Sequence, residues 1–152
     1  MSDFQSVEIL LVEDNPTDAE LTMRALRKSH LANSVTWFKD GAQALDFIYR
    51  RDAYSALANN LPKLILLDLK LPKVDGIEVL RQLKSDERTK TIPVVVLTSS
   101  RAEEDVLKSY GLHANCYIVK PIDLDQFIQV VQSIENFWLC VVTLASPASA
   151  WR

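Results

Sequence analysis

A few polar residues could together carry out phosphoryl transfer. Each of them lies at the end of a short apolar run. They are three acids, a hydroxyl and an ammonium, namely Glu13, Asp14, Asp68, Thr98 and Lys120. Carboxylates a few ångströms apart repel one another unless a cation binds, and Mg²⁺ prefers oxygen ligands. The hydroxyl and the ammonium can each bind a phosphate oxygen. An oxygen of Asp68 could then accept a phosphoryl group beside Mg²⁺, or beside Mn²⁺ in its place.

The elements that would position these residues are short apolar strands alternating with amphipathic helices. Residues 64–67 are aliphatic at every position, which is typical of a strand buried on both faces of a parallel sheet. We predict strands at residues 7–12, 34–38, 64–68, 92–97 and 116–119. We predict helices from residue 16 to about 30, from 41, from 77, from 100 to 111 and after 123. Asn15 or Asp14 can cap the first helix, and Gly111 can end the fourth.

This repeated strand–helix order predicts an α/β fold. The expected form is a flavodoxin-like, doubly wound, five-stranded parallel sheet in the order 2-1-3-4-5 with five helices. Ligands of such folds bind outside the carboxyl ends of the strands. The polar residues that end the strands should therefore meet at one edge of the sheet.

Composition limits the class of protein. The chain has 152 residues, a net charge of -3 and 48% hydrophobic residues, which fits one soluble domain. We place this domain at residues 1–144 and expect residues 145–152 to be a disordered tail. The acidic balance gives no sign of nucleic-acid binding. No apolar run approaches the ~20 residues of a membrane span, and no leader pattern begins the chain, so we expect a cytoplasmic protein.

Other phosphate-binding classes fit the sequence less well. The chain has three glycines, and neither the P-loop of nucleotidases nor the GxGxxG of dinucleotide-binding folds is present. The loop after the first strand reads Glu-Asp-Asn-Pro, whereas a flavin-binding relative would be expected to have Ser, Thr and Gly there. In haloacid-dehalogenase-like phosphatases a second Asp follows two residues after the first, and that position is Lys70 here.

Taken together, these motifs resemble the response-regulator receiver domain of two-component signalling. The resemblance covers residues 7–138. It rests on Glu13-Asp14, on Asp68 followed by Leu71-Pro72 and Asp75-Gly76, on Thr98, and on Tyr117 with Lys120-Pro121.

The resemblance implies a role for each matching residue. Asp68 would be the phosphoacceptor, and Lys120 would pair with it and then with the phosphoryl group. Asp14 would bind Mg²⁺ directly, Glu13 would bind it through water, and the backbone carbonyl of Lys70 would be a further ligand. Glu13 departs from the commoner Asp, and its longer reach could alter the affinity for Mg²⁺.

The same resemblance implies a switch. Thr98 would be the switch hydroxyl and Tyr117 the switch aromatic, while Lys70 and Ser100 would tune dephosphorylation. Such a protein is not an enzyme acting on external substrates; it catalyses only its own Mg²⁺-dependent phosphorylation and dephosphorylation.

A narrower resemblance is to the small cyanobacterial phytochrome response regulators, carried by residues 112–117, 123–127 and 135–139. It implies a phytochrome-type histidine kinase as phosphoryl donor in a red/far-red light pathway, and it implies a homodimer. Residues 137–144 are nearly all apolar, and one helix face cannot bury all of them within a single domain. Either this segment extends and packs over the fold, or it forms an interface. Because the resemblance implies a homodimer, we expect a dimer interface that includes Phe137, Trp138 and Leu139.

Two classes of function remain open. In the first, the chain is a phosphorylated module that signals by contact with an unknown downstream protein, with no nucleic acid or membrane as partner. In the second, it is a receiver-fold binding scaffold with little or no phosphorylation. Phosphotransfer to Asp68 distinguishes the two classes.

Overall fold

The computed structural model describes residues 9–28, 35–51, 61–99, 101–112, 114, 116–120, 123, 125 and 129. Strands and helices alternate along the chain. They are β1 (Ile9–Val12), α1 (Pro16–Lys28), β2 (Val35–Phe38), α2 (Gly41–Ile48), β3 (Leu64–Asp68), α3 (Gly76–Ser85), β4 (Val94–Thr98), α4 (Arg101–Ser109) and β5 (Cys116–Val119).

The strands form one five-stranded sheet in the order β2-β1-β3-β4-β5, and every neighbouring pair is parallel. The predicted fold class and strand order are thereby confirmed. The predicted fifth helix falls mostly outside the described residues, among which Asp125 and Gln129 have helical backbone. The predicted ends of the first strand at residue 7 and of the first helix near residue 30 also lie outside them.

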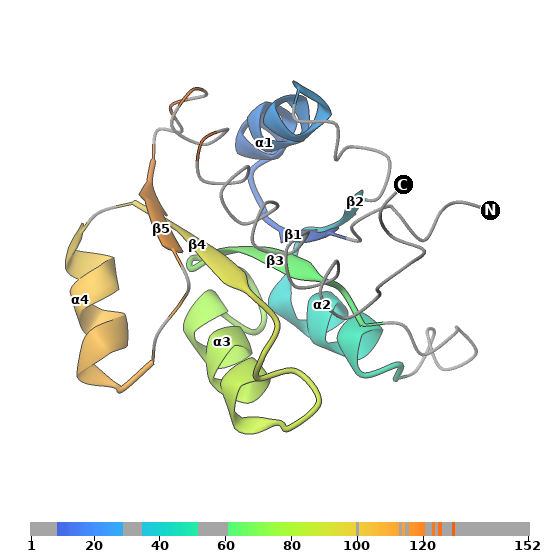
Figure 1. Ribbon diagram of the computed structural model, residues 1–152, viewed down its shortest axis with the longest axis vertical. Helices are drawn as coiled ribbons and strands as arrows, with labels where there is room; N and C mark the ends of the chain where they lie inside the picture. The colour runs from blue at the N-terminus through green and yellow to red at the C-terminus, as the bar shows by residue number, and fades with distance from the viewer. Residues whose placement is uncertain are drawn as a thin grey trace, which may run out of the picture.

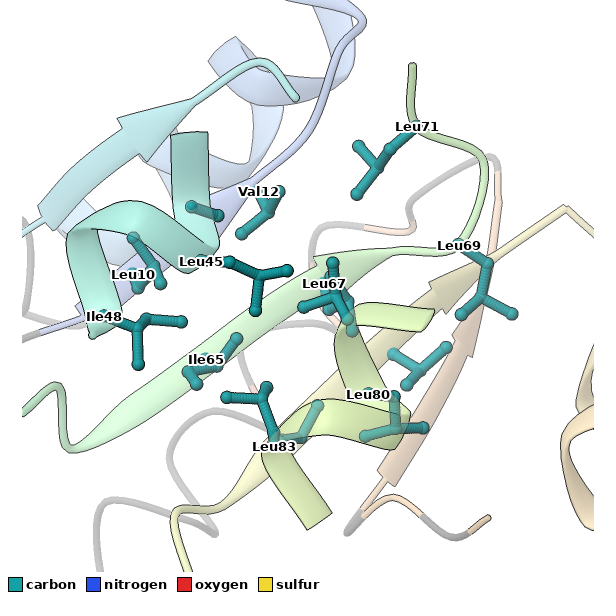
Figure 2. Close-up of a cluster of buried hydrophobic side chains, with 14 of the residues drawn as sticks. Leu10, Val12, Leu45, Ile48, Ile65, Leu67, Leu69, Leu71, Leu80 and Leu83 are labelled. Carbon is teal, nitrogen blue, oxygen red and sulfur yellow. The ribbon is translucent and has the colours of Figure 1, made fainter. Parts of the chain in front are cut away.

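Helices cover both faces of the sheet (Figure 1). Helices α2 and α3 lie on one face, over a cluster that includes Leu10, Ile65 and Leu67 (Figure 2). Helix α1 lies on the other face, over a cluster that includes Leu11 and Leu66. Successive residues of a strand point to opposite faces, so strands that are covered on both sides are apolar at each position. Each fully buried aliphatic side chain stabilises the fold by about 1.5–3 kcal/mol.

Short polar contacts set the ends of the helices. The Asn15 side chain accepts a hydrogen bond from the Asp18 N–H at 3.0 Å, so Asn15 caps α1. Gly111 ends α4 with a φ of 72°. The N–H of Leu112 bonds to the carbonyl of Leu107 at 3.0 Å, as expected for a left-handed glycine after a helix.

Among the described residues, no helix combines the length and the apolar character needed to cross a bilayer.

Candidate functional site

The carboxyl ends of β1, β3 and β5 direct charged side chains toward α1. Apolar residues of these strands lie in the cluster beneath α1, namely Leu11, Leu66 and Ile118. Because side chains alternate along a strand, the residue two positions further on keeps to the same face. Those residues are Glu13, Asp68 and Lys120. Strand alternation thus gathers two acids and a cation at one corner of the sheet edge.

The three carboxylates predicted to bind a metal lie together. Oxygen atoms of Glu13, Asp14 and Asp68 are all within 4.8 Å of one another. Glu13 is fully buried and Asp68 is 4% exposed, whereas Asp14 faces solvent. Burial, followed by the hydrogen bond and charge of Asp68, raises the pKa of Glu13 to about 8. An oxygen-only cluster with too little positive charge fits a hard divalent cation such as Mg²⁺ or Mn²⁺.

The backbone of Glu13 is fixed by the neighbouring edge strand. Its N–H bonds to the carbonyl of Phe38 at 3.0 Å. Its carbonyl accepts a hydrogen bond from Trp37 Nε1 at 2.8 Å. The buried carboxylate therefore extends from a backbone held by β2.

Lys120 contacts three carboxylates. Its Nζ lies 3.0 Å from Asp18 Oδ2, 3.1 Å from Glu13 Oε1 and 3.3 Å from Asp68 Oδ2. Burial by itself would lower the pKa of the ammonium. The hydrogen bond to Asp18 and the charges of Asp68 and Glu13 outweigh that effect and raise the pKa instead. Lys120 is therefore a permanent cation beside Asp68.

The loop between β3 and α3 supports Asp68 from the other side. The Lys70 N–H donates to Asp68 Oδ1 at 3.2 Å. Gly76 begins α3 so close to the strand that a Cβ there would lie 2.3 Å from the Asp68 carbonyl oxygen, so only glycine fits. Over these residues lies a solvent-open depression of about 400 Å³, lined by Asp14, Asn15, Pro16, Asp18, Asp68, Lys70, Ser99 and Lys120.

Thr98 ends β4 on the opposite face of the sheet from Asp68, by alternation with Val94 and Val96 of the α2–α3 cluster. Its side chain is fully buried, and its hydroxyl has no hydrogen-bond partner within the described part of the chain. A buried hydroxyl without a partner costs about 1–3 kcal/mol. The structure therefore brings a free hydroxyl to the edge where Asp68 lies.

Tyr117 lies opposite Val96 in the β4–β5 pair. Its half-buried ring packs against the α2–α3 cluster, and its hydroxyl accepts a hydrogen bond from the Ala114 N–H at 3.1 Å. The ring is thus on the same face of the sheet as Thr98. Its role as switch aromatic stays a prediction.

Two acids that the sequence did not assign to the site also lie at this edge; for Glu103 it predicted only a capping box with Ser100. Asp18 contacts Lys120, as described above. Glu103 accepts hydrogen bonds from the Ser99 N–H at 2.9 Å and the Ser99 hydroxyl at 2.7 Å, and it pairs with Lys70 at 3.3 Å. Both acids stand in the first turn of a helix, where the helix dipole commonly favours a negative charge. Nothing in the sequence separates them from acids with only that stabilising role.

Comparison with known families decides the class of the chain. Residues 9–132 match the model of the response regulator receiver domain. The chain belongs to this family.

This receiver domain is similar to known phytochrome regulators. Response regulator Rcp1 of Synechocystis sp. is 46% identical to it over 136 residues, which are 90% of this chain and 91% of the relative. Bacteriophytochrome response regulator RtBRR is 49% identical, with a TM-score of 0.79 over 86% of this chain and 78% of that one. The phosphorylated cyanobacterial phytochrome response regulator RcpA is 46% identical, with a TM-score of 0.73 over 88% and 94%. The Mn²⁺-bound form of Rcp1 has a TM-score of 0.70 at 45% identity, over 86% and 92%.

These similarities confirm both the receiver-domain resemblance and the narrower resemblance to cyanobacterial phytochrome regulators. Within this receiver domain, the predicted acids, hydroxyl and lysine all lie at the carboxyl edge of the sheet. The predicted residues Ser100, Phe137, Trp138 and Leu139 lie outside the described residues.

Proposed function

We propose that this receiver domain is a response regulator that accepts a phosphoryl group on Asp68 from a phytochrome-type histidine kinase. The observation that carries the proposal is the position of Asp68, whose buried carboxylate lies beside those of Glu13 and Asp14 and 3.3 Å from Lys120 Nζ. The similarity to RcpA, a regulator known in a phosphorylated form, supports it. The proposal includes a cytoplasmic location.

The transfer itself is a displacement at phosphorus. An oxygen of Asp68 forms a bond to phosphorus while the bond from phosphorus to the donor's imidazole nitrogen breaks. The imidazole leaves with the bonding electron pair and takes up a proton from solvent. Lys120 neutralises charge on the phosphoryl oxygens, and positioning with neutralisation is the main source of rate in such reactions. The Thr98 hydroxyl, which has no partner among the described residues, can then donate to a phosphoryl oxygen.

Mg²⁺ is the proposed cofactor, with Mn²⁺ as a substitute. When bound, the cation would supply further neutralisation of the phosphoryl oxygens. Asp14, Asp68 and the carbonyl of Lys70 would hold it directly, and Glu13 would hold it through water. The oxygen-only cluster and the Mn²⁺-bound form of Rcp1 support this assignment. Replacing Asp14 with Ala should weaken Mg²⁺ binding by at least about tenfold in a calorimetric titration.

The signal would pass through the other face of the sheet edge. Phosphorylation adds a charge of about −1.5 to −2, which must change a two-state element to have an effect. We propose that Thr98 and Tyr117 form this element and reshape the surface of α4 and β5, where Val106, Tyr110 and Val119 are exposed. A downstream protein would recognise that surface.

Two further parts of the proposal concern residues around the site and beyond it. Lys70 and Ser100 would tune the lifetime of the phosphoryl group, which the decay rate of a Lys70→Ala variant tests.

A homodimer would form through a surface that includes Phe137, Trp138 and Leu139. Its sedimentation at tens of micromolar, with and without a phosphoryl analogue, tests that part.

Radiolabelled phosphotransfer from a panel of histidine kinases tests the function. We expect a phytochrome-type kinase to label the wild type in the presence of Mg²⁺, and Asp68→Asn to remain unlabelled. Excess chelator should abolish the labelling. If neither a kinase nor acetyl phosphate labels the wild type, the receiver-fold scaffold becomes the better assignment.

A further inference from the structure

The ammonium of Lys120 has a third partner that does not belong to the acidic cluster. Asp18 Oδ2 lies 3.0 Å from Lys120 Nζ, closer than either Glu13 or Asp68. Lys120 has three N–H donors, and three carboxylates surround it. Among the described residues, the group that could hold a metal comprises Glu13, Asp14 and Asp68, and Asp18 is not part of it.

We propose that Asp18 is a positioning residue that keeps Lys120 aligned with Asp68 during phosphoryl transfer. The inference rests on the proposed function. A divalent cation would draw on the charge of Glu13 and Asp68, and the incoming phosphoryl group would change Asp68 from a carboxylate into an acyl phosphate. Asp18 would then be the carboxylate that still anchors the ammonium.

The position of Asp18 is itself fixed by a short ring of contacts. The Asn15 N–H donates to Glu13 Oε2 at 3.1 Å, and the Asn15 side chain accepts from the Asp18 N–H at 3.0 Å. The carbonyl of Asp18 accepts from the buried Thr22 hydroxyl at 3.0 Å. The cap of α1 therefore ties the backbone of Asp18 to a member of the acidic cluster, and the side chain closes the ring through Lys120.

Two simpler roles for Asp18 make different predictions. An acid in the first turn of α1 could serve only to stabilise the helix, in which case the transfer rate would not depend on it. An extra negative charge near the site could merely repel an anionic donor, in which case removing it would speed the transfer. A positioning role predicts that removing the charge slows the transfer.

The test uses acetyl phosphate as donor and the full chain with saturating Mg²⁺. The Asp68 oxygen displaces acetate, which leaves with the electron pair of its bond to phosphorus. For Asp18→Asn we expect the maximal rate of Asp68 phosphorylation to fall about five- to tenfold, because the ammonium is less well aligned. The half-saturating acetyl phosphate concentration and the Mg²⁺ dissociation constant should stay within about twofold. Asp18→Glu, which restores the charge, should recover most of the rate.

Two controls show whether the effect acts through Lys120. Glu20→Gln removes an acid from the exposed side of the same helix, where it pairs with Arg24 and Arg27, and should leave the rate unchanged. In a Lys120→Ala background, Asp18→Asn should cause no further loss of the residual rate.

The outcomes separate this inference from the function on which it rests. An Asp18→Asn variant that is phosphorylated at or above the wild-type rate would overturn the positioning role and leave the proposed function intact. Additive losses in the double variant would also overturn it. A wild type that takes no phosphoryl group from acetyl phosphate or from any kinase would overturn both.

Discussion

The two sides of the sheet's carboxyl edge are built in opposite ways. On the α1 side, Lys120 is surrounded by the carboxylates of Glu13, Asp18 and Asp68. The other side is here called the α4 side, because Leu107 of α4 belongs to the same buried cluster as Val94 and Val96. There the buried hydroxyl of Thr98 finds no hydrogen-bond partner among the residues described. On the first side the charged groups already contact one another before any phosphoryl group binds. On the second side the Thr98 hydroxyl still lacks a partner within the described residues. Alternation along the strands produces this division, because neighbouring positions of one edge face different helices.

The largest expected effect on the rate of phosphorylation comes from removing a charged side chain on the α1 side. Lys120→Ala removes the cation beside Asp68, and we expect phosphorylation by acetyl phosphate to slow by at least about 100-fold, as for loss of a group that neutralises transition-state charge. Labelling rates at saturating Mg²⁺ measure this. Lys90→Ala removes an exposed lysine that pairs with Glu87 and should label at the wild-type rate. A Lys120→Ala rate within a few-fold of wild type would contradict a neutralising role.

A smaller effect should appear as pH dependence on the same side. The pKa of Glu13 is raised from 4.5 to about 8, so the folded state holds this proton more tightly than the unfolded state does. The stabilisation is fully present below pH 4.5 and is lost as pH rises through about 8. The metal-free protein should therefore unfold at progressively lower temperature between pH 5 and 8.

Glu13→Gln should flatten this dependence, because the amide does not titrate. The raised pKa of Lys120 acts only above its ordinary value of 10.5, outside this range. The lowered pKa values of Glu78 and Asp86 act near or below pH 4.5. Thermal unfolding in chelator measures the dependence, and an equal slope in the variant would exclude Glu13 as its source.

The smallest effect distinguishes the α4 side from an ordinary buried threonine. Thr98 and Thr89 are both fully buried, but the Thr89 hydroxyl donates to the Leu83 carbonyl at 2.7 Å. Thr89→Val should cost about 1–2 kcal/mol, whereas Thr98→Val should be neutral or stabilising by up to about 1 kcal/mol. Urea denaturation of the unphosphorylated protein measures both. Equal losses at the two positions would mean that the Thr98 hydroxyl has a partner.

The features that the sequence predicted are those that depend on position along a strand. Asp68 and Lys120 stand at the ends of apolar runs, so their meeting at one edge follows from a parallel sheet alone. The contact of Asp18 with Lys120 and that of Glu103 with Lys70 escaped prediction, because both depend on how a helix is rotated over the sheet and on the path of the preceding loop. The lack of a partner for the Thr98 hydroxyl within the described residues depends on side-chain packing at atomic detail, which residue types alone do not reveal.

One contact at the edge strand gives this site an optical consequence. Trp37 donates its indole N–H at 2.8 Å to the backbone carbonyl of Glu13, whose side chain belongs to the acidic cluster. Indole emission responds to nearby charge, so neutralising that cluster should shift the fluorescence of Trp37. The other tryptophans of the chain are Trp138 and Trp151, and replacing both with Phe would leave Trp37 as the single tryptophan, which can be excited selectively over the tyrosines. Occupancy of the site could then be followed in real time without a label.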